Sequence, residues 1–212
     1  MTNRPLVLVA FLTLVLFSVP LFKPQDEAGA PRVSFFRGLL PLGEERFPPL
    51  PPAPDSLNGA NAWLAVNERG LEIIRKSEGL RLKSYYLAGQ WLIGYGHAAT
   101  ARKDLIITHA EADALLLADT KEAEEAVRRL IAAPINENEF SALVSLAYNM
   151  GPASFAKTQV VKRLNAGDRA GAADAFRHLV AADINGQRVA LDALKRRRVR
   201  ERALFLKPPL RA

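Results

Sequence analysis

The chain has 212 residues, which is enough for one well-buried domain with additional segments but too few for two ordinary domains. It contains no cysteine, which excludes a disulfide framework, a thiolate metal site and a cysteine nucleophile. From residue 60 onward 24 basic residues stand against 17 acidic ones, so the whole net charge of +7 lies in this part. Such an excess favours an anionic partner, namely a nucleic acid, a membrane face or an acidic wall polymer, or it serves solubility alone.

Residues 5–22 form an apolar run without charge that contains six Leu, four Val and three Phe. Eighteen helical residues span roughly 27 Å, which is close to the thickness of the hydrocarbon layer of a bilayer. Arg4 precedes the run, and a positive flank tends to stay in the cytoplasm. Residues 1–22 are therefore predicted to be an N-terminal transmembrane signal anchor of a single-pass inner-membrane protein whose folded domain lies in the periplasm.

A cleaved signal peptide is the alternative for the same segment. The small residues Ala28-Gly29-Ala30 are a candidate cleavage site, but they lie several residues beyond the apolar run and Pro31 follows them. The run is also longer than a typical signal-peptide core. An uncleaved anchor is favoured, and cleavage stays open.

Residues 23–58 are predicted to be a linker, because they hold eight of the fourteen prolines. Residues 48–54 should be stiff and polyproline-like, since proline lacks a backbone donor and does not fit a helix interior. The linker is either a spacer or a recognition element for an envelope protein partner.

The third region, residues 60–207, is predicted to be the folded domain, and its first part has the pattern of a helix. Within residues 63–77, Leu64, Leu71 and Ile74 recur at helical spacing, and Gly79 is a suitable stop. The pattern then changes to period two around the turn-prone Ala88-Gly89-Gln90, which predicts a β-hairpin within residues 81–95.

Further helices follow with recognisable starts and stops. Thr108 with Glu111 and Asn136 with Glu139 have the spacing of capping boxes. Gly151 is expected to end the second of these helices, and Asp168 is expected to cap a later one. A last helix is predicted over residues 191–205. The fold class is therefore α+β, mostly helical, with one small antiparallel hairpin sheet.

Two segments carry a family resemblance, namely residues 76–85, KSEGLRLKSY, and residues 91–97, WLIGYGH. With the helix starts described above and the run FSALVSLAYNMG at residues 140–151, they resemble the phage-type lysozymes of glycoside hydrolase family 24. The resemblance extends over residues 68–206. It implies a phage-lysozyme-like domain over residues 60–207. It also implies muramidase chemistry, the hydrolysis of the β-1,4 bond between N-acetylmuramic acid and N-acetylglucosamine in peptidoglycan.

Glu78 corresponds to the general-acid glutamate of that family. Its predicted place at a helix C-terminus, partly buried beside the hairpin, disfavours the ionised carboxylate, as suits a group that donates a proton. The alternative is an ordinary helix-end glutamate that bonds to the backbone or to an arginine.

The rest of the family's catalytic set is replaced. The family has an Asp at the end of the first hairpin strand and a Thr in the second, whereas this chain has Leu87 and Leu92. Because glycoside hydrolysis usually needs a second carboxyl group, the resemblance implies a degenerate site with weak or lost muramidase activity. The leucines would either offer apolar surface to a sugar or reflect repacking of the hairpin. The competing hypothesis is an active muramidase that takes a carboxylate from elsewhere, such as the segment around Asp104.

Tyr85, Trp91 and His97 are the candidate substrate-binding residues, although the resemblance implies a mainly structural role for His97. No spacing of metal ligands and no cofactor motif is present, so neither is expected. The basic cluster at residues 195–202 could indicate nucleic-acid binding. The resemblance places it on a structural helix, so the expected partners are peptidoglycan glycan strands and the inner membrane, and not nucleic acid.

Overall fold

The computed structural model describes residues 58–87, 89–184 and 187–209. In chain order the elements are α2 (Asn58–Asn61), α3 (Glu68–Glu78), β1 (Arg81–Leu87), β2 (Gln90–Gly94), α4 (His109–Leu130), α5 (Glu137–Met150), α6 (Pro152–Ala156), α7 (Gln159–Asn165), α8 (Arg169–Ala175), η1 (Phe176–His178), β3 (Ala181–Ile184), β4 (Gln187–Ala190) and α9 (Asp192–Phe205). This element content confirms the predicted α+β class.

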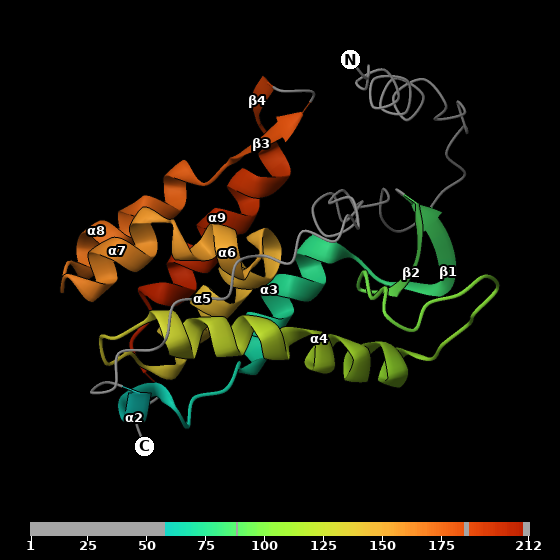
Figure 1. Ribbon diagram of the computed structural model, residues 1–212, viewed down its shortest axis with the longest axis horizontal. Coiled ribbons are helices and arrows are strands. Elements are labelled where there is room, and N and C mark those ends of the chain that lie inside the picture. Colours follow the sequence, from blue (N-terminus) through green and yellow to red (C-terminus); the bar gives the residue numbers. More distant parts are fainter. Residues whose placement is uncertain (1–57, 88, 185–186, 210–212) are drawn as a thin grey trace, which may run out of the picture.

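The hairpin of β1 and β2 lies at one end of the molecule and most helices gather at the other (Figure 1). The long helix α4 extends from below this hairpin to the helical end, and α3 leads directly into β1. The place where α3 gives way to β1 is therefore the junction between the sheet and the helices.

One hydrophobic core holds the helices together, and all of its members lie between Leu64 and Phe205. The helix α5 is its centre, because Phe140, Leu143 and Leu146 on it are completely buried. Burial of apolar surface on this scale is the main force that stabilises a domain of this size.

The predicted transmembrane segment and linker fall outside the part of the chain that the structure describes, apart from the last linker residue, Asn58. None of the helices in the described part is both long enough and apolar enough to cross a bilayer.

The helix predicted over residues 63–77 starts later than expected, at Glu68. Asn67 is its N-cap, and its side chain accepts a hydrogen bond from the backbone N–H of Gly70. Trp63 lies before the helix and is 74% exposed. The prediction extended too far because Leu64 is buried at a helical interval from Leu71 without belonging to that helix.

The other predicted helix boundaries are confirmed. Both capping boxes form, at Thr108 with Glu111 and at Asn136 with Glu139. Gly151, with φ of 80°, ends α5, and the side chain of Asp168 caps α8. Local side-chain-to-backbone hydrogen bonds suffice to set these ends, which is why the sequence predicts them well.

The prediction of one hairpin sheet was wrong, because β3 and β4 form a second antiparallel hairpin within the described residues. The two residues between these strands in the sequence are Asn185-Gly186, a strong short-range hairpin signal. The signal was missed because the flanking strands have only four residues each and carry no clear alternation of apolar and polar residues.

Gly70 allows the close approach of α3 to α5. A Cβ atom at this position would lie 2.8 Å from the Cβ of Ser141 and 2.9 Å from a methyl carbon of Val66. The change Gly70→Ala is therefore expected to lower the free energy of unfolding by about 1–3 kcal/mol, despite the better helix propensity of alanine. Urea denaturation measures this loss.

The matched control is Gly59→Ala in α2, where no atom lies within 4 Å of the added methyl group. Its free energy of unfolding should stay within about 0.5 kcal/mol of the wild type. Equal free energies of unfolding for the two variants would show that a methyl group at position 70 fits between α3 and α5 without a clash.

Candidate functional site

Glu78 is the last residue of α3 and is only 7% exposed. Gly79 follows with φ of 75°, a conformation that glycine adopts without strain, and its N–H donates to the carbonyl of Arg75. The chain then turns directly into β1. The carboxyl group of Glu78 is thereby held at the junction of the helices and the first hairpin, as the sequence predicted.

The side chain of Arg197, from α9, binds Glu78. Its Nη1 atom donates to Oε1 of Glu78 at 2.6 Å, and its Nε atom donates to Oε1 of Glu201 at 3.0 Å. Its Nη2 atom donates to the backbone carbonyl of Ser145 on α5 at 3.0 Å. One buried guanidinium group therefore joins α3, α5 and α9.

Arg198 completes this buried network from the other side of Glu201. It donates from Nη1 to Oε2 of Glu201, from Nη2 to the side-chain oxygen of Asn149, and from Nε to the carbonyl of Leu179 at 3.0 Å. The Glu201 side chain has no exposed surface and also accepts from the hydroxyl of Ser145 at 2.7 Å. Two carboxylates and two guanidinium groups thus balance in charge.

Burial and neighbouring charges act in opposite directions on the two arginines. Burial alone would lower the pKa of Arg197, but the charges of Glu78 and Glu201 outweigh it and raise the pKa. For Arg198 burial dominates and lowers the pKa, although Glu201 opposes it. The predicted structural role of the arginine run is confirmed for these two residues, each 3% exposed, while Arg196 is exposed.

The network changes the electrostatic environment expected for Glu78. Helix end and burial were considered in the expectation, but the structure adds a guanidinium group whose Nη1 atom lies 2.6 Å from Oε1 of Glu78. Glu78 therefore also fits the alternative given in the sequence analysis, in which it is a helix-end glutamate paired with an arginine.

Side chains of β1 and β2 divide between the two faces of their hairpin. Tyr85 is paired with Leu92 and Leu87 with Gln90, whereas Tyr86 is paired with Trp91. Because directly paired residues share a face and successive residues alternate, the first four lie on one face and the last two on the other.

Tyr85, on the first of these faces, lies near enough to Glu78 for the two groups to interact electrostatically. Burial raises the pKa of Tyr85, the nearby cation of Arg81 lowers it, and the charge of Glu78 raises it further. The Arg81 guanidinium carbon lies 4.6 Å from the centre of the Tyr85 ring. A phenol in this setting stays neutral near pH 7, so Tyr85 does not replace a carboxylate.

The two leucines differ in exposure. Leu87 is half-buried, whereas Leu92 is only 1% exposed and packs inside the domain. The expectation that both leucines line a sugar cleft was therefore wrong for Leu92, because a buried side chain presents no surface to a ligand. For Leu92 the repacking interpretation of the substitution is the better one.

Trp91 and His97 lie apart from the face with Tyr85. Trp91 contacts Tyr86 edge-on, with ring centres 5.3 Å apart, on the opposite hairpin face. His97 is buried, accepts from the backbone N–H of Thr100 at Nε2, and bonds through Nδ1 to Asp119 at 3.0 Å. Both ring nitrogens are thus engaged within the protein, which fits the structural role implied for His97.

No replacement for the second carboxyl group faces Glu78 among the contacts of the described residues. Glu201 shares Arg197 with Glu78 but is fully buried. Asp104 is exposed and adopts φ of 57°, and the residues after it bind the outer edge of β1: Ser84 donates to Leu105 at 2.9 Å.

Sequence reasoning missed the partners of Glu78. The signals were present, because Arg197 and Glu201 are four residues apart on one helix, as are Ser145 and Asn149 on another. Nothing in either spacing indicates that these helix faces meet at Glu78.

Comparison with known proteins agrees with this architecture. A sequence model described as phage lysozyme matches residues 75–201. The endolysin of Acyrthosiphon pisum secondary endosymbiont phage 1 is 38% identical over 141 residues, which cover 66% of this chain and 97% of that protein. The SAR-endolysin of Escherichia phage Mu is 35% identical over 96 residues, 45% of this chain and 56% of that protein.

A solved structure of the muramidase domain of SpmX from Asticaccaulis excentricus has a TM-score of 0.66 and 40% identity. The match covers 68% of this chain and 99% of that one. The hydrophobic core of the described residues lies entirely between Leu64 and Phe205, as is expected of a domain that can fold on its own.

Replacement of Arg197 tests the network. Arg197→Met would leave Glu78 and Glu201 buried without their shared cation, which is expected to lower the free energy of unfolding by about 3–5 kcal/mol. The control is Arg196→Met on the exposed side of the same helix, with an effect of about 0.5 kcal/mol or less. Urea denaturation of both variants decides the matter, and similar losses would contradict a special role for Arg197.

Proposed function

Because the chain belongs to the phage lysozyme family, we propose that its folded domain binds or acts on peptidoglycan in the bacterial envelope with weak or lost hydrolysis. The observation that carries this proposal is the hairpin face toward Glu78, which presents Tyr85 and Leu87 and no carboxylate. Glu78 is the general-acid position, and Leu87 and Leu92 are the degenerate Asp and Thr positions of the family.

The chemistry of glycoside cleavage supports reduced activity. One carboxyl group can protonate the leaving oxygen, but a second is needed to stabilise the oxocarbenium-like transition state or to activate water. Loss of one such electrostatic group costs on the order of 10²-fold in rate.

The same face suits binding of a glycan. The half-buried ring of Tyr85 and the side chain of Leu87 offer apolar surface to the C–H face of a sugar. The guanidinium group of Arg81 over Tyr85 adds hydrogen-bond donors for hydroxyl or carboxylate groups. Trp91, on the opposite face, would contact substrate only if the glycan wraps around the hairpin, and buried His97 would act by holding the local chain conformation.

We propose further that residues 1–22 anchor the protein in the inner membrane and residues 23–58 tether the domain of residues 60–207 in the periplasm. A flexible linker of this length spans roughly 30 Å on average, and a fully extended polyproline one about 110 Å. The tethered domain would then search the wall near the membrane. The proline-rich linker remains a candidate site for an envelope protein partner.

An active muramidase is the second candidate function. The matched phage relatives are named endolysin and SAR-endolysin, which favours activity, and Glu78 is retained in place. This candidate requires a carboxylate that reaches the Glu78 face when glycan binds.

Release of soluble muropeptides from Gram-negative peptidoglycan separates the two candidates. The wild-type fragment of residues 58–212 is expected to sediment with peptidoglycan and to release little or nothing. Leu87→Asp alone, and with Leu92→Thr, is expected to increase release by roughly 10²-fold, because it restores the missing carboxylate. The single variant matters because a threonine at the buried Leu92 position costs about 1–2 kcal/mol of stability by itself.

The control for this experiment is Glu78→Gln in the same backgrounds. Release by the wild type that disappears with Glu78→Gln would refute the proposal of weak or lost activity and establish the active muramidase. Failure of the wild type to sediment with peptidoglycan would refute the binding proposal.

Membrane anchoring is tested with residues 1–58 in a Gram-negative cell. An alkaline phosphatase fused after residue 58 is expected to be active, because the positive amino-terminal flank should leave the fusion outside the cytoplasm. The fusion should stay in the membrane fraction, and residues 23–58 fused alone should give no phosphatase activity. An active but soluble fusion would show that the segment is a cleaved signal peptide.

A further inference from the structure

The outward side of α9 combines cations with exposed apolar side chains. Val199 is 68% exposed and Leu206, directly after the helix, is 52% exposed, although both are aliphatic. They lie on one stripe with basic and small residues at intervals of three and four, and Asp192, an acidic residue seven positions before Val199, is ion-paired with Lys195. The stripe consists of Arg196, Val199, Arg200, Ala203, Leu206 and Lys207.

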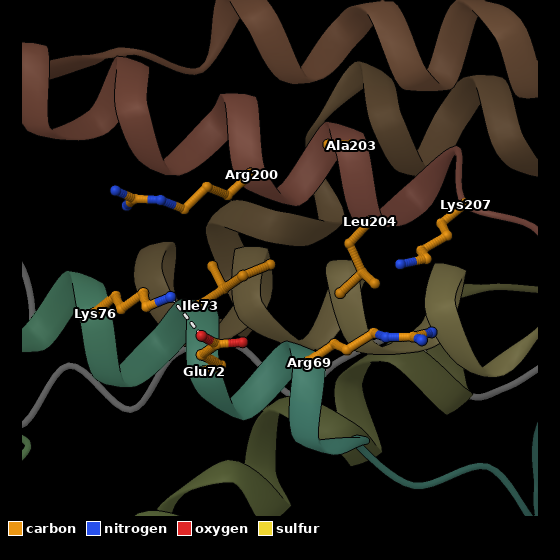
Figure 2. Close-up of a pocket in the computed structure, with 8 residues that line it drawn as sticks. All are labelled: Arg69, Glu72, Ile73, Lys76, Arg200, Ala203, Leu204 and Lys207. Carbon is orange, nitrogen blue, oxygen red and sulfur yellow. Dashed lines mark hydrogen bonds and ion pairs between the residues drawn. The ribbon is translucent and has the colours of Figure 1, made fainter.

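The helix α3 lies opposite part of this stripe, and a groove of about 420 Å³ separates the two elements. Its floor includes Ile73 and Leu204, while Arg69 and Lys76 line it from α3. In Figure 2 the Arg200 side chain extends over the Lys76 end, and Lys207 lies above Arg69 at the other end. Like charges therefore face each other across both ends of the groove.

Glu72, the acidic residue of the groove, neutralises only part of this positive charge. Glu72 forms an ion pair with Lys76, and Arg69 donates to the side-chain oxygen of Asn138 at 3.3 Å. Within the described residues, Arg200 and Lys207 form no ion pair with a carboxylate. The two charged ends are seven residues apart along each helix, or roughly 10 Å, so the positive charge extends along the groove.

We propose that this basic–apolar face, the α9 stripe together with Arg69 and Lys76, binds the surface of an anionic phospholipid bilayer. Arginine and lysine side chains attract lipid phosphates, and exposed aliphatic side chains enter the boundary between headgroups and acyl chains. A nucleic acid would satisfy the cations but not Val199 and Leu206, since stacking on bases requires aromatic or guanidinium planes.

This inference goes beyond the proposed function, because it concerns contact of the folded domain itself with lipid. The inward side of the same helix carries Arg197, which holds Glu78. Lipid binding through Arg196 and Arg200 would therefore fix the orientation of the helix that positions the Glu78 site.

The test is co-sedimentation of the fragment of residues 58–212, which lacks the predicted anchor, with vesicles. We expect binding to vesicles of phosphatidylcholine mixed with phosphatidylglycerol, little binding to phosphatidylcholine alone, and weakening at high salt. The variant Arg196→Gln/Arg200→Gln/Lys207→Gln should reduce the affinity roughly 100-fold, because each cation near an anionic surface contributes about fivefold.

The matched control removes the same charge elsewhere, with Arg102→Gln/Lys103→Gln/Lys157→Gln, all of which are exposed. It should change the affinity only a few-fold. A second variant, Val199→Ser/Leu206→Ser, should weaken binding by about tenfold while the salt dependence is kept, because it removes apolar contacts alone. The thermal unfolding midpoint of each variant should match the wild type, since every altered side chain is at least partly exposed.

The proposal would be overturned if the fragment bound both kinds of vesicle equally well. It would also be overturned if the triple variant of Arg196, Arg200 and Lys207 and the control triple variant lost the same amount of vesicle affinity. The proposal would also fail if Arg196→Gln/Arg200→Gln/Lys207→Gln lowered the affinity for duplex DNA or for peptidoglycan but left the affinity for lipid unchanged. The variant Arg196→Gln/Arg200→Gln/Lys207→Gln should still sediment with peptidoglycan as the wild type does. This measurement distinguishes failure of the lipid proposal from failure of the proposed function.

Discussion

The buried ion pair between Glu78 and Arg197 ties together the helices α3, α5 and α9. Arg197 is almost fully buried and bonds to α3 through Glu78, to α5 through Ser145 and to Glu201 on its own helix. A buried guanidinium group without its carboxylates is strongly destabilising. Glu78 therefore has a structural reason to be present whether or not it donates a proton, and its presence alone is weak support for catalysis.

The hairpin decides what Glu78 can do chemically. A carboxyl group at the junction of α3 and β1 needs a partner across from it, and the facing side of the hairpin supplies a neutral phenol and a half-buried leucine. Leu92 is buried in the interior and offers no surface to a ligand. Apolar contact, with Arg81 at the edge, is the interaction that this face offers to a sugar.

The helix α9 has two sides with opposite electrostatic roles. On the inward side, Arg197 and Arg198 are neutralised by Glu78 and Glu201, so their charge acts within the fold. On the outward side, Arg196, Arg200 and Lys207 lie beside exposed aliphatic residues, and their charge acts on the surroundings. One run of basic residues thus serves both cohesion of the domain and the long-range field around it.

Features that depend on neighbours along the chain could be predicted from the amino-acid sequence. The capping boxes at Thr108 and Asn136, the stop at Gly151 and the first hairpin are local hydrogen-bonding and turn effects, and the family motifs placed Glu78 at a helix end. Which groups meet could not be predicted in this way. The bond of Glu78 to Arg197 joins residues 119 positions apart, and Leu92 is buried while Leu87 is not, because long-range packing and not local propensity selects the contacts of each side chain.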